Sequence, residues 1–213
     1  MIDSYRHKGM RKNMVAELVK KGIDNPVVQK ALEEVPRHWF LDNAFLEIAY
    51  ENKAFQIGCG QTISHPYTVA FQSQILEVKK GDKILEIGTG CGYQTSILVA
   101  LGAKVFSIER HRPLYIKTKA LLNKLRIRAR LFYGDGYIGQ ASFAPFDKII
   151  VTAAAPYIPD PLLEQLAPGG TMIIPVGEGK EQIMTLVKKT ASGEILKEEK
   201  GAFSFVPMLQ NKE

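Results

Sequence analysis

The chain has 213 residues, 46% of them hydrophobic, and is therefore long enough to bury one substantial core. Its longest apolar run, residues 149–155, is far too short to span a bilayer, and residues 1–6 lack the apolar stretch of a signal peptide. The formal net charge of +6 favours an anionic partner but does not identify one. We expect a cytoplasmic protein that has no membrane partner.

The two cysteines, Cys59 and Cys91, are too few for a disulfide framework or for a zinc site of their own. They fit a reducing compartment. Cys59 as a nucleophile is one interpretation, and a loop thiol without a function is the simpler one. We expect no metal.

Residues 1–60 are predicted to form a helical N-terminal lobe. Gly22 marks the end of one helix, and Asn25 followed by Pro26 marks the start of the next, because a cap and a proline at the first helical position are typical of helix starts. The expected helices cover residues 9–21, the segment from Pro26 to a stop at Pro36, and residues 41–50.

Polar side chains crowd into residues 58–67, which read Gly-Cys-Gly-Gln-Thr-Ile-Ser-His-Pro-Tyr. The Gly-x-Gly entry predicts a tight turn in a loop, and Pro66 suits the first position of a helix that runs through residue 78. Ser64 or His65 would be the N-cap of that helix. The segment is either a simple capped helix start or part of a functional site.

From residue 82 onward, short apolar strands alternate with amphipathic segments, which predicts an α/β fold with a mostly parallel, doubly wound, Rossmann-like sheet and helices on both faces. Residues 182–188 follow a Gly-Glu-Gly-Lys turn region and predict a late antiparallel pair. We expect one domain over residues 1–213, with residues from about 178 to 213 on the substrate side. The expected strands are 83–87, 104–108, 129–133, 148–152, 171–176, 182–188 and a further one at 203–206.

A glycine-rich turn, Gly-Thr-Gly-Cys-Gly-Tyr at residues 88–93, joins the first of these strands to a helix at 94–101. Such a turn lets the backbone approach a ligand closely. Glu109 ends the next strand, where a carboxylate can accept both hydroxyls of a ribose, and Asp135 follows the third strand, placed to accept from an adenine amino group. The predicted adenosine site is built from Gly88, Thr89, Gly90, Gly92, Glu109, Asp135 and Gly136.

An adenosine site of this kind suits either NAD or S-adenosylmethionine. The turn has the spacing Gly-x-Gly-x-Gly, whereas dinucleotide sites have Gly-x-Gly-x-x-Gly. The second half of a dinucleotide would also need another mononucleotide unit, which 213 residues scarcely accommodate. The spacing and the terminal antiparallel pair favour S-adenosylmethionine.

Several segments together resemble the protein-L-isoaspartate O-methyltransferases, and the likeness extends from about residue 14 to residue 208. Two of them, Gln-Thr-Ile-Ser at 61–64 and Val-Thr-Ala-Ala-Ala-Pro at 151–156, are specific to that family, whereas the glycine loop and Pro-Gly-Gly are shared by many methyltransferases. The other segments are Ser-Ile-Glu-Arg at 107–110, Gly-Asp-Gly-Tyr at 134–137 and Leu-Ala-Pro-Gly-Gly at 166–170.

The resemblance implies methyl transfer from S-adenosylmethionine, which leaves S-adenosylhomocysteine, to the free carboxylate of an isoaspartyl residue in a damaged protein. The ester then collapses to a succinimide, and hydrolysis returns some normal aspartate. The partners implied are isoaspartyl proteins and peptides, with no nucleic acid, and the expected state is a monomer. The family's active-site serine corresponds to Ser64, and the substrate side to Thr62, Ile63, His65 and Val206.

The chemistry restricts what Ser64 has to do. A carboxylate has a pKa near 4 and is already an anionic nucleophile at neutral pH, so the reaction needs neither a general base nor a serine nucleophile. Alignment of the attacking oxygen limits an in-line displacement, and good alignment contributes roughly 7 to 11 kcal/mol. We expect the Ser64 hydroxyl to orient the carboxylate through one hydrogen bond, with Thr62 as a weaker candidate.

Two rival functions fit parts of the sequence. A nucleic-acid methyltransferase would suit the basic run at residues 110–130, although leucines at helical spacing also explain that run as a solvated amphipathic helix. Enzymes that methylate amino groups usually carry Asn-Pro-Pro-Tyr or Asp-Pro-Pro-Tyr where this chain has Val-Thr-Ala-Ala-Ala-Pro. A binding module without turnover is the second rival, and the intact glycine loop, Glu109, Asp135 and Ser64 argue against it.

Overall fold

The N-terminal helices begin where the sequence supplies caps. The computed structural model describes residues 2–213, and in it the Ser4 side chain accepts a hydrogen bond from the backbone N–H of His7. This cap starts α1 (Tyr5–Lys20) four residues before the expected start. Asn25 caps α2 (Pro26–Glu34) as expected. The third expected helix is a 3-10 helix at Asn43–Ile48, preceded by another at Arg37–Phe40.

The polar segment at 58–65 is not the loop that its glycines predict. It belongs to a β-hairpin of β1 (Phe55–Gly58) and β2 (Gln61–Ile63), in which Phe55 pairs with Ile63 and both side chains are buried. Cys59 and Gly60 form the turn, with φ of +53° and +67°. Positive φ at both central residues matches the twist of the two strands that a two-residue turn joins.

The hairpin leads directly into α3 (Pro66–Ile75), and His65 occupies its N-cap position without a capping hydrogen bond from its side chain. Ser64 therefore is not the cap. Its side chain is free of that structural task, which leaves it available for the pocket beside β2.

The main sheet has seven strands in the order β5-β4-β3-β6-β7-β8-β9. Strands β3 to β7 are parallel, and β8 and β9 are antiparallel additions at one edge, as expected of the terminal pair. The elements are β3 (Lys83–Ile87), α4 (Tyr93–Ala100), β4 (Lys104–Glu109), α5 (Arg112–Lys124), β5 (Arg130–Tyr133), a 3-10 helix (Ala141–Phe143), β6 (Phe146–Val151), α6 (Asp160–Gln165), β7 (Leu166–Val176), β8 (Gln182–Lys189) and β9 (Ile195–Phe203).

The prediction of a strand at 203–206 is wrong. The last strand is β9, which ends at Phe203, and most of its side chains are exposed. Its sequence, Ile-Leu-Lys-Glu-Glu-Lys-Gly-Ala-Phe, lacks the apolar alternation of a half-buried strand because β9 is the edge of the sheet, where charged residues discourage pairing with other chains.

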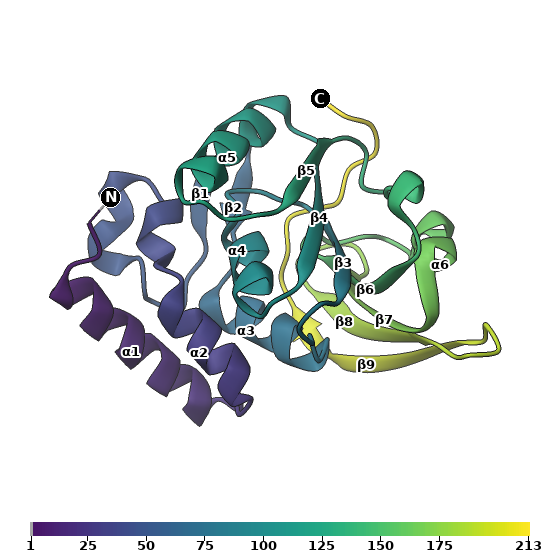
Figure 1. Cartoon of the computed structure of the whole chain (residues 1–213), viewed down its shortest axis with the longest axis horizontal. Coiled ribbons are helices and arrows are strands. Elements are labelled where there is room, and N and C mark those ends of the chain that lie inside the picture. Colours follow the sequence, from purple (N-terminus) through teal and green to yellow (C-terminus); the bar gives the residue numbers. More distant parts are fainter. Residues whose placement is uncertain (1) are drawn as a thin grey trace.

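Both faces of the sheet are buried, and helices cover them unequally (Figure 1). On one face Ile84 and Val105 pack against Leu98 of α4, and on the other Phe106 and Ile149 pack in a cluster that includes Leu162 of α6. The N-terminal helices add an outer layer over α3 and α4 (Figure 1). In residues 2–213, no helix combines the length and the apolar character that crossing a membrane requires.

Candidate active site

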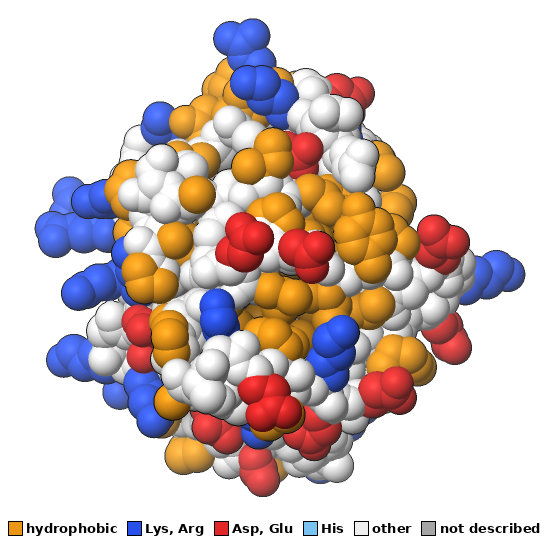
Figure 2. Space-filling view, turned by 90° about the vertical axis from the view of Figure 1, so that its right-hand side faces the viewer, with side chains coloured by type: hydrophobic (Ala, Val, Ile, Leu, Met, Phe, Trp, Pro, Cys, Tyr) orange, Lys and Arg blue, Asp and Glu red, His pale blue; other side chains and the backbone are white. Residues whose placement is uncertain are grey.

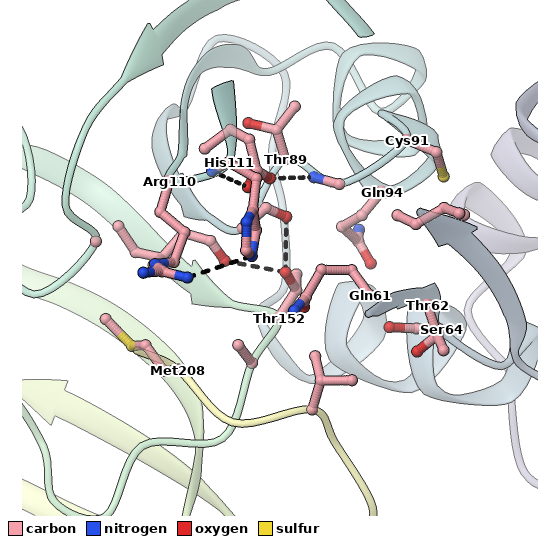
Figure 3. Close-up of a pocket in the computed structure, with 18 of the residues that line it drawn as sticks. Gln61, Thr62, Ser64, Thr89, Cys91, Gln94, Arg110, His111, Thr152 and Met208 are labelled. Carbon is pink, nitrogen blue, oxygen red and sulfur yellow. Dashed lines mark hydrogen bonds between the residues drawn. The ribbon is translucent and has the colours of Figure 1, made fainter. Parts of the chain in front are cut away.

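A pocket lies at the carboxyl ends of β3 and β4. The chain runs outward from β3 to β4 and β5, then returns to β6 on the other side of β3, so the strand order reverses beside this pocket. Doubly wound sheets bind ligands at such a reversal. Figure 3 shows Thr62 and Ser64 on one side of the pocket and Arg110 and His111 on the other.

The glycine turn after β3 brings bare backbone to the pocket wall. Gly88 and Gly90 line the pocket with φ of +93° and +54°, a region that side-chain-bearing residues rarely adopt. A Cβ on Gly88 would lie 2.5 Å from the Thr152 hydroxyl oxygen. Such a cradle fits a ligand that contacts the main chain, as the sequence predicts.

Glu109 is 4% exposed and lines the pocket at the end of β4. One carboxylate oxygen accepts from the backbone N–H of Gly90 at 2.8 Å, and the other accepts from that of His111 at 2.9 Å. Each oxygen keeps a further lone pair, because a carboxylate offers about four acceptor sites. The pair of oxygens fits the two hydroxyls of a ribose.

The sequence-predicted adenosine residues do not all reach the pocket. Gly88, Thr89, Gly90, Glu109 and Gly136 line it. Gly92 and Asp135 are absent from its lining. A Cβ on Gly92 would lie 2.9 Å from Thr118 of α5, so this glycine is needed for close helix packing.

The Asp135 carboxylate faces a neighbouring depression beyond the C-terminal segment. It accepts from the backbone N–H of Tyr137 at 2.8 Å and from that of Asn211 at 2.7 Å. Both oxygens thus hold backbone in place, at Tyr137 and at Asn211. Direct contact between Asp135 and an adenine amino group stays a prediction.

The predicted substrate residues gather on the opposite side. Thr62, Ile63 and Ser64 of the β2 end line the main pocket together with Val206. A smaller pocket opens beside it, and Ser64 lies where the two meet. The side chains of the smaller pocket are mostly hydroxylic, and its lining comprises Ala54, Thr62, Ser64, His65, Thr68, Thr152, Ser204, Phe205 and Val206.

Thr152 is a residue of both pockets that sequence reasoning left without a role. Its hydroxyl donates to the carbonyls of Ile87 and Gly88 at 2.9 and 2.8 Å, which ties β6 to the glycine turn (Figure 3). Its place in the Val-Thr-Ala-Ala-Ala-Pro segment was the available signal.

The C-terminal segment closes the pocket, and the sequence singled out only Val206 in it. Ala154 anchors the segment on both sides, since its N–H donates to the Val206 carbonyl at 2.8 Å and its carbonyl accepts from Met208 at 2.6 Å. Farther along, the Arg110 side chain donates to the Asn211 carbonyl at 2.9 Å. Met208, Arg110 and His111 thereby join the lining (Figure 3).

Two titratable side chains in the lining of these pockets are held neutral. Burial lowers the pKa of His65, and the nearby Arg37 lowers it further. Burial raises the pKa of Cys91 to about 11, so at neutral pH it is a thiol and not a thiolate. Neither group supplies a charge to the acceptor side.

Asp3, His7 and His38 form a group among the described residues whose ligand atoms all lie within 4.8 Å of one another, remote from the pocket. Both Asp3 oxygens accept from Arg11, at 3.0 and 2.9 Å, and His38 pairs with the Tyr50 hydroxyl at 2.7 Å. These bonds account for the group as a structural network.

The sheet with its antiparallel edge, the glycine turn and the acid at the end of the next strand define the class of S-adenosylmethionine-dependent methyltransferases. A family model described as Protein-L-isoaspartate(D-aspartate) O-methyltransferase (PCMT) matches residues 9–213. Proteins named protein-L-isoaspartate O-methyltransferase from Christiangramia forsetii and Flavobacterium psychrophilum are each 54% identical over 213 residues, which are all of both chains. The chain belongs to the protein-L-isoaspartate(D-aspartate) O-methyltransferase family.

Solved structures agree with this assignment. A protein-L-isoaspartate O-methyltransferase matches with a TM-score of 0.86 at 28% identity, over 95% of this chain and 67% of that one. A putative protein-L-isoaspartate O-methyltransferase from Plasmodium falciparum, in complex with S-adenosyl-L-homocysteine, matches with a TM-score of 0.82 at 25% identity, over 94% and 99% of the two chains.

Proposed function

We propose that this chain transfers a methyl group from S-adenosylmethionine to the free carboxylate of L-isoaspartyl residues in damaged proteins and peptides. The observation that carries the proposal is the position of Ser64. It lies where the pocket assigned to S-adenosylmethionine meets a smaller pocket lined with hydroxyl groups. When bound, S-adenosylmethionine supplies an electrophilic methyl group on a sulfonium.

Ser64 orients the acceptor in this proposal. The carboxylate arrives ionised, so the Ser64 hydroxyl donates one hydrogen bond to it and leaves its charge in place. Thr62, on the same strand end, is a second donor toward the acceptor. His65 is neutral and does not neutralise the nucleophile. Ile63 and Val206 shape the apolar walls.

Glu109 and the glycine turn hold the donor. The Glu109 oxygens would accept hydrogen bonds from the ribose hydroxyls. The backbone of the pocket wall lets the donor approach closely at Gly88, Thr89, Gly90 and Gly136. We assign Asp135 to the adenine side, where its carboxylate accepts from the backbone N–H of Asn211 and so holds that backbone in place. Gly92 serves the donor indirectly, through the packing of α5.

We further propose that the enzyme is a cytoplasmic monomer whose methyl acceptors are proteins, with no nucleic acid as substrate and no membrane partner. The free thiols Cys59 and Cys91 suit a reducing compartment. Ala153, in the lining after β6, offers no side-chain acceptor of the kind that holds an exocyclic base nitrogen. Light scattering on a sizing column tests the monomer.

Methyl transfer is tested with a synthetic isoaspartyl peptide, its aspartyl twin and tRNA, each supplied with labelled S-adenosylmethionine. We expect label in the isoaspartyl peptide alone. Label in tRNA alone, or equal label in both peptides, contradicts the proposal.

Ser64→Ala tests the orienting role. Turnover should fall about a hundredfold while the affinity for S-adenosylhomocysteine stays unchanged, since only acceptor alignment is lost. The matched control is Ser204→Ala in the same smaller pocket, because the Ser204 hydroxyl already donates to the Lys180 carbonyl at 2.9 Å. Ser204→Ala should keep nearly full turnover, and unaltered turnover in Ser64→Ala would remove Ser64 from the mechanism.

A further inference from the structure

A second concavity lies at the opposite end of the strands from the active site, and its charged lining is entirely basic. Lys83, Lys104 and Arg130 begin β3, β4 and β5 there, whereas the carboxyl ends of β3 and β4 line the catalytic pocket. Arg126 and Arg128 complete the set of five cations, and no Asp or Glu lines the concavity. We name it the basic cleft.

In the part of the chain that the structure describes, the five cations of the basic cleft form no recorded ion pairs, and the carboxylate of Asp147 at the rim accepts from the backbone N–H of Lys83 at 2.8 Å. Among residues 2–213, each recorded ion pair involves cations outside the cleft. Lys104, Arg126, Arg128 and Arg130 are all exposed. Many Lys and Arg side chains project along the left-hand edge of the molecule in Figure 2. This edge is the side of the molecule that faces the viewer in Figure 1. Uncompensated like charges in a concave surface attract anions.

Three arginines lie on the outer side of the segment that joins α5 to β5. Exposure alternates there, since Arg126, Arg128 and Arg130 are exposed whereas Ile127 and Ala129 are half-buried, so the three arginines project to solvent. Planar guanidinium groups match phosphate oxygens bidentately, which a row of ammonium groups does not. The segment therefore presents three phosphate-binding groups close together on one surface.

Arg126 also occupies a backbone position where glycine is favoured. It follows the end of α5 with φ of +58°, and Ile127 N–H donates to the Leu122 carbonyl at 2.9 Å in a Schellman motif. The same motif after α1 and α4 contains Gly22 and Gly102. An arginine at a position that favours glycine is consistent with a use for its side chain.

Aromatic rings in the cleft are covered and do not form a platform for bases. The guanidinium of Arg130 lies over the rings of Phe106 and Phe143, at 5.4 and 5.3 Å from their centroids, and the Lys83 ammonium lies 5.6 Å from that of Phe106. Proteins that bind single-stranded nucleic acids stack bases on exposed rings. The cleft is suited to phosphate groups without bases.

We propose that the basic cleft binds a linear chain of phosphate groups, such as inorganic polyphosphate, at a site separate from the methyl-transfer pocket. Arg126, Arg128 and Arg130 contact phosphates spaced along the chain, and Lys83 and Lys104 add charge at the strand starts.

The test measures binding of inorganic tripolyphosphate and of long-chain polyphosphate to the full chain by calorimetry, at low and at physiological salt. We expect binding that weakens as salt rises and falls about tenfold for each of Arg126→Gly and Arg128→Gln. Arg126→Gly should keep or raise the melting temperature, because glycine suits that φ, so its loss of binding cannot come from misfolding. Methyl transfer should be unchanged in both.

Lys20→Gln and Lys30→Gln are charge-matched controls on exposed positions of α1 and α2, and they should leave polyphosphate binding intact. Equal losses in controls and cleft variants would show a diffuse effect of net charge and overturn the proposal. Absent polyphosphate binding, or tighter binding of a single-stranded oligonucleotide in the same cleft, would also overturn it.

Discussion

The buried Arg37 guanidinium donates a hydrogen bond of 2.8 Å to the backbone carbonyl of Ser64. The same side chain donates to the carbonyls of Lys53 at 3.1 Å and Ala49 at 3.0 Å, and it lies 4.9 Å from the centroid of the Tyr93 ring. Arg37 therefore joins the N-terminal lobe, the β2 end and the start of α4 directly behind the proposed acceptor site. We infer that Arg37 sets the position of Ser64.

Arg37→Met should lower both stability and turnover. The carbonyls of Ala49, Lys53 and Ser64 lose their donor, which should cost about 3 kcal/mol of unfolding free energy. Ser64 would also lose its anchor, and a misplacement of about 1 Å costs roughly a hundredfold in rate. Denaturant unfolding and methylation of an isoaspartyl peptide, measured well below the melting temperature, check the two effects.

Arg11→Met is the matched control. Arg11 is also buried in the N-terminal lobe and hydrogen-bonds to Asp3, Glu33 and Tyr50, none of which lines the pocket. It should lose stability with little loss of turnover. Equal activity in the folded fractions of the two variants would show that Arg37 acts through stability alone.

Gly136→Ala and Gly88→Ala should differ in whether a second mutation rescues them. A Cβ on Gly136 would clash with the Ile87 Cγ2 atom, a side-chain clash that Ile87→Ala removes, and its other close neighbour is the flexible end of Met208 at 3.1 Å. Gly88 has φ of +93°, which no neighbouring truncation relieves. Calorimetric titration with S-adenosylhomocysteine should show affinity lost in both single variants and regained only in Gly136→Ala/Ile87→Ala. Rescue of Gly88→Ala by Thr152→Ala would show that crowding, and not φ, governs that position.

The two thiols should react at very different rates. Cys59 is exposed in the hairpin turn, whereas burial raises the pKa of Cys91 to about 11. At neutral pH, iodoacetamide should label Cys59 first, and Cys59→Ser should react only slowly. Mass spectrometry of the labelled peptides follows both sites, and rapid labelling of Cys91 at neutral pH would contradict the prediction.

Glu86 should make the folded state less stable as pH rises. Burial raises its pKa to about 7, against an ordinary value of 4.5, although Thr95 donates a hydrogen bond to it at 2.5 Å. The folded chain thus holds this proton more tightly, so its contribution is fully present below about pH 4.5 and is lost as pH rises through 7. The shift corresponds to about 3 kcal/mol.

Glu86→Gln should remove this dependence. The difference in unfolding free energy between the variant and the parent, from urea titrations, should grow with pH between about 4.5 and 7 and then level off. The exposed Glu164→Gln should give a pH-independent difference. A flat difference for Glu86→Gln would mean that the buried carboxyl ionises at its ordinary pKa.

Much of the fold could be predicted because its elements carry local patterns. The strand at Lys83–Ile87 has the expected bounds, since its last four residues are buried inside a parallel sheet and all of them except Glu86 are apolar. The hairpin of β1 and β2 was not expected, because its strands are only four and three residues long and its turn contains cysteine in place of the usual Asn or Gly.

By itself the sequence determined the strand, glycine turn and helix that hold a donor, the acid at Glu109 and the hydroxyls of the β2 end, because each depends on residues close together in the chain. Tertiary structure alone decided that Arg37 lies behind Ser64, that Thr152 ties β6 to Gly88, and that the Asp135 carboxylate is turned toward Asn211. These contacts join residues from 27 to 76 positions apart, and such pairs meet only once helices and sheet have packed.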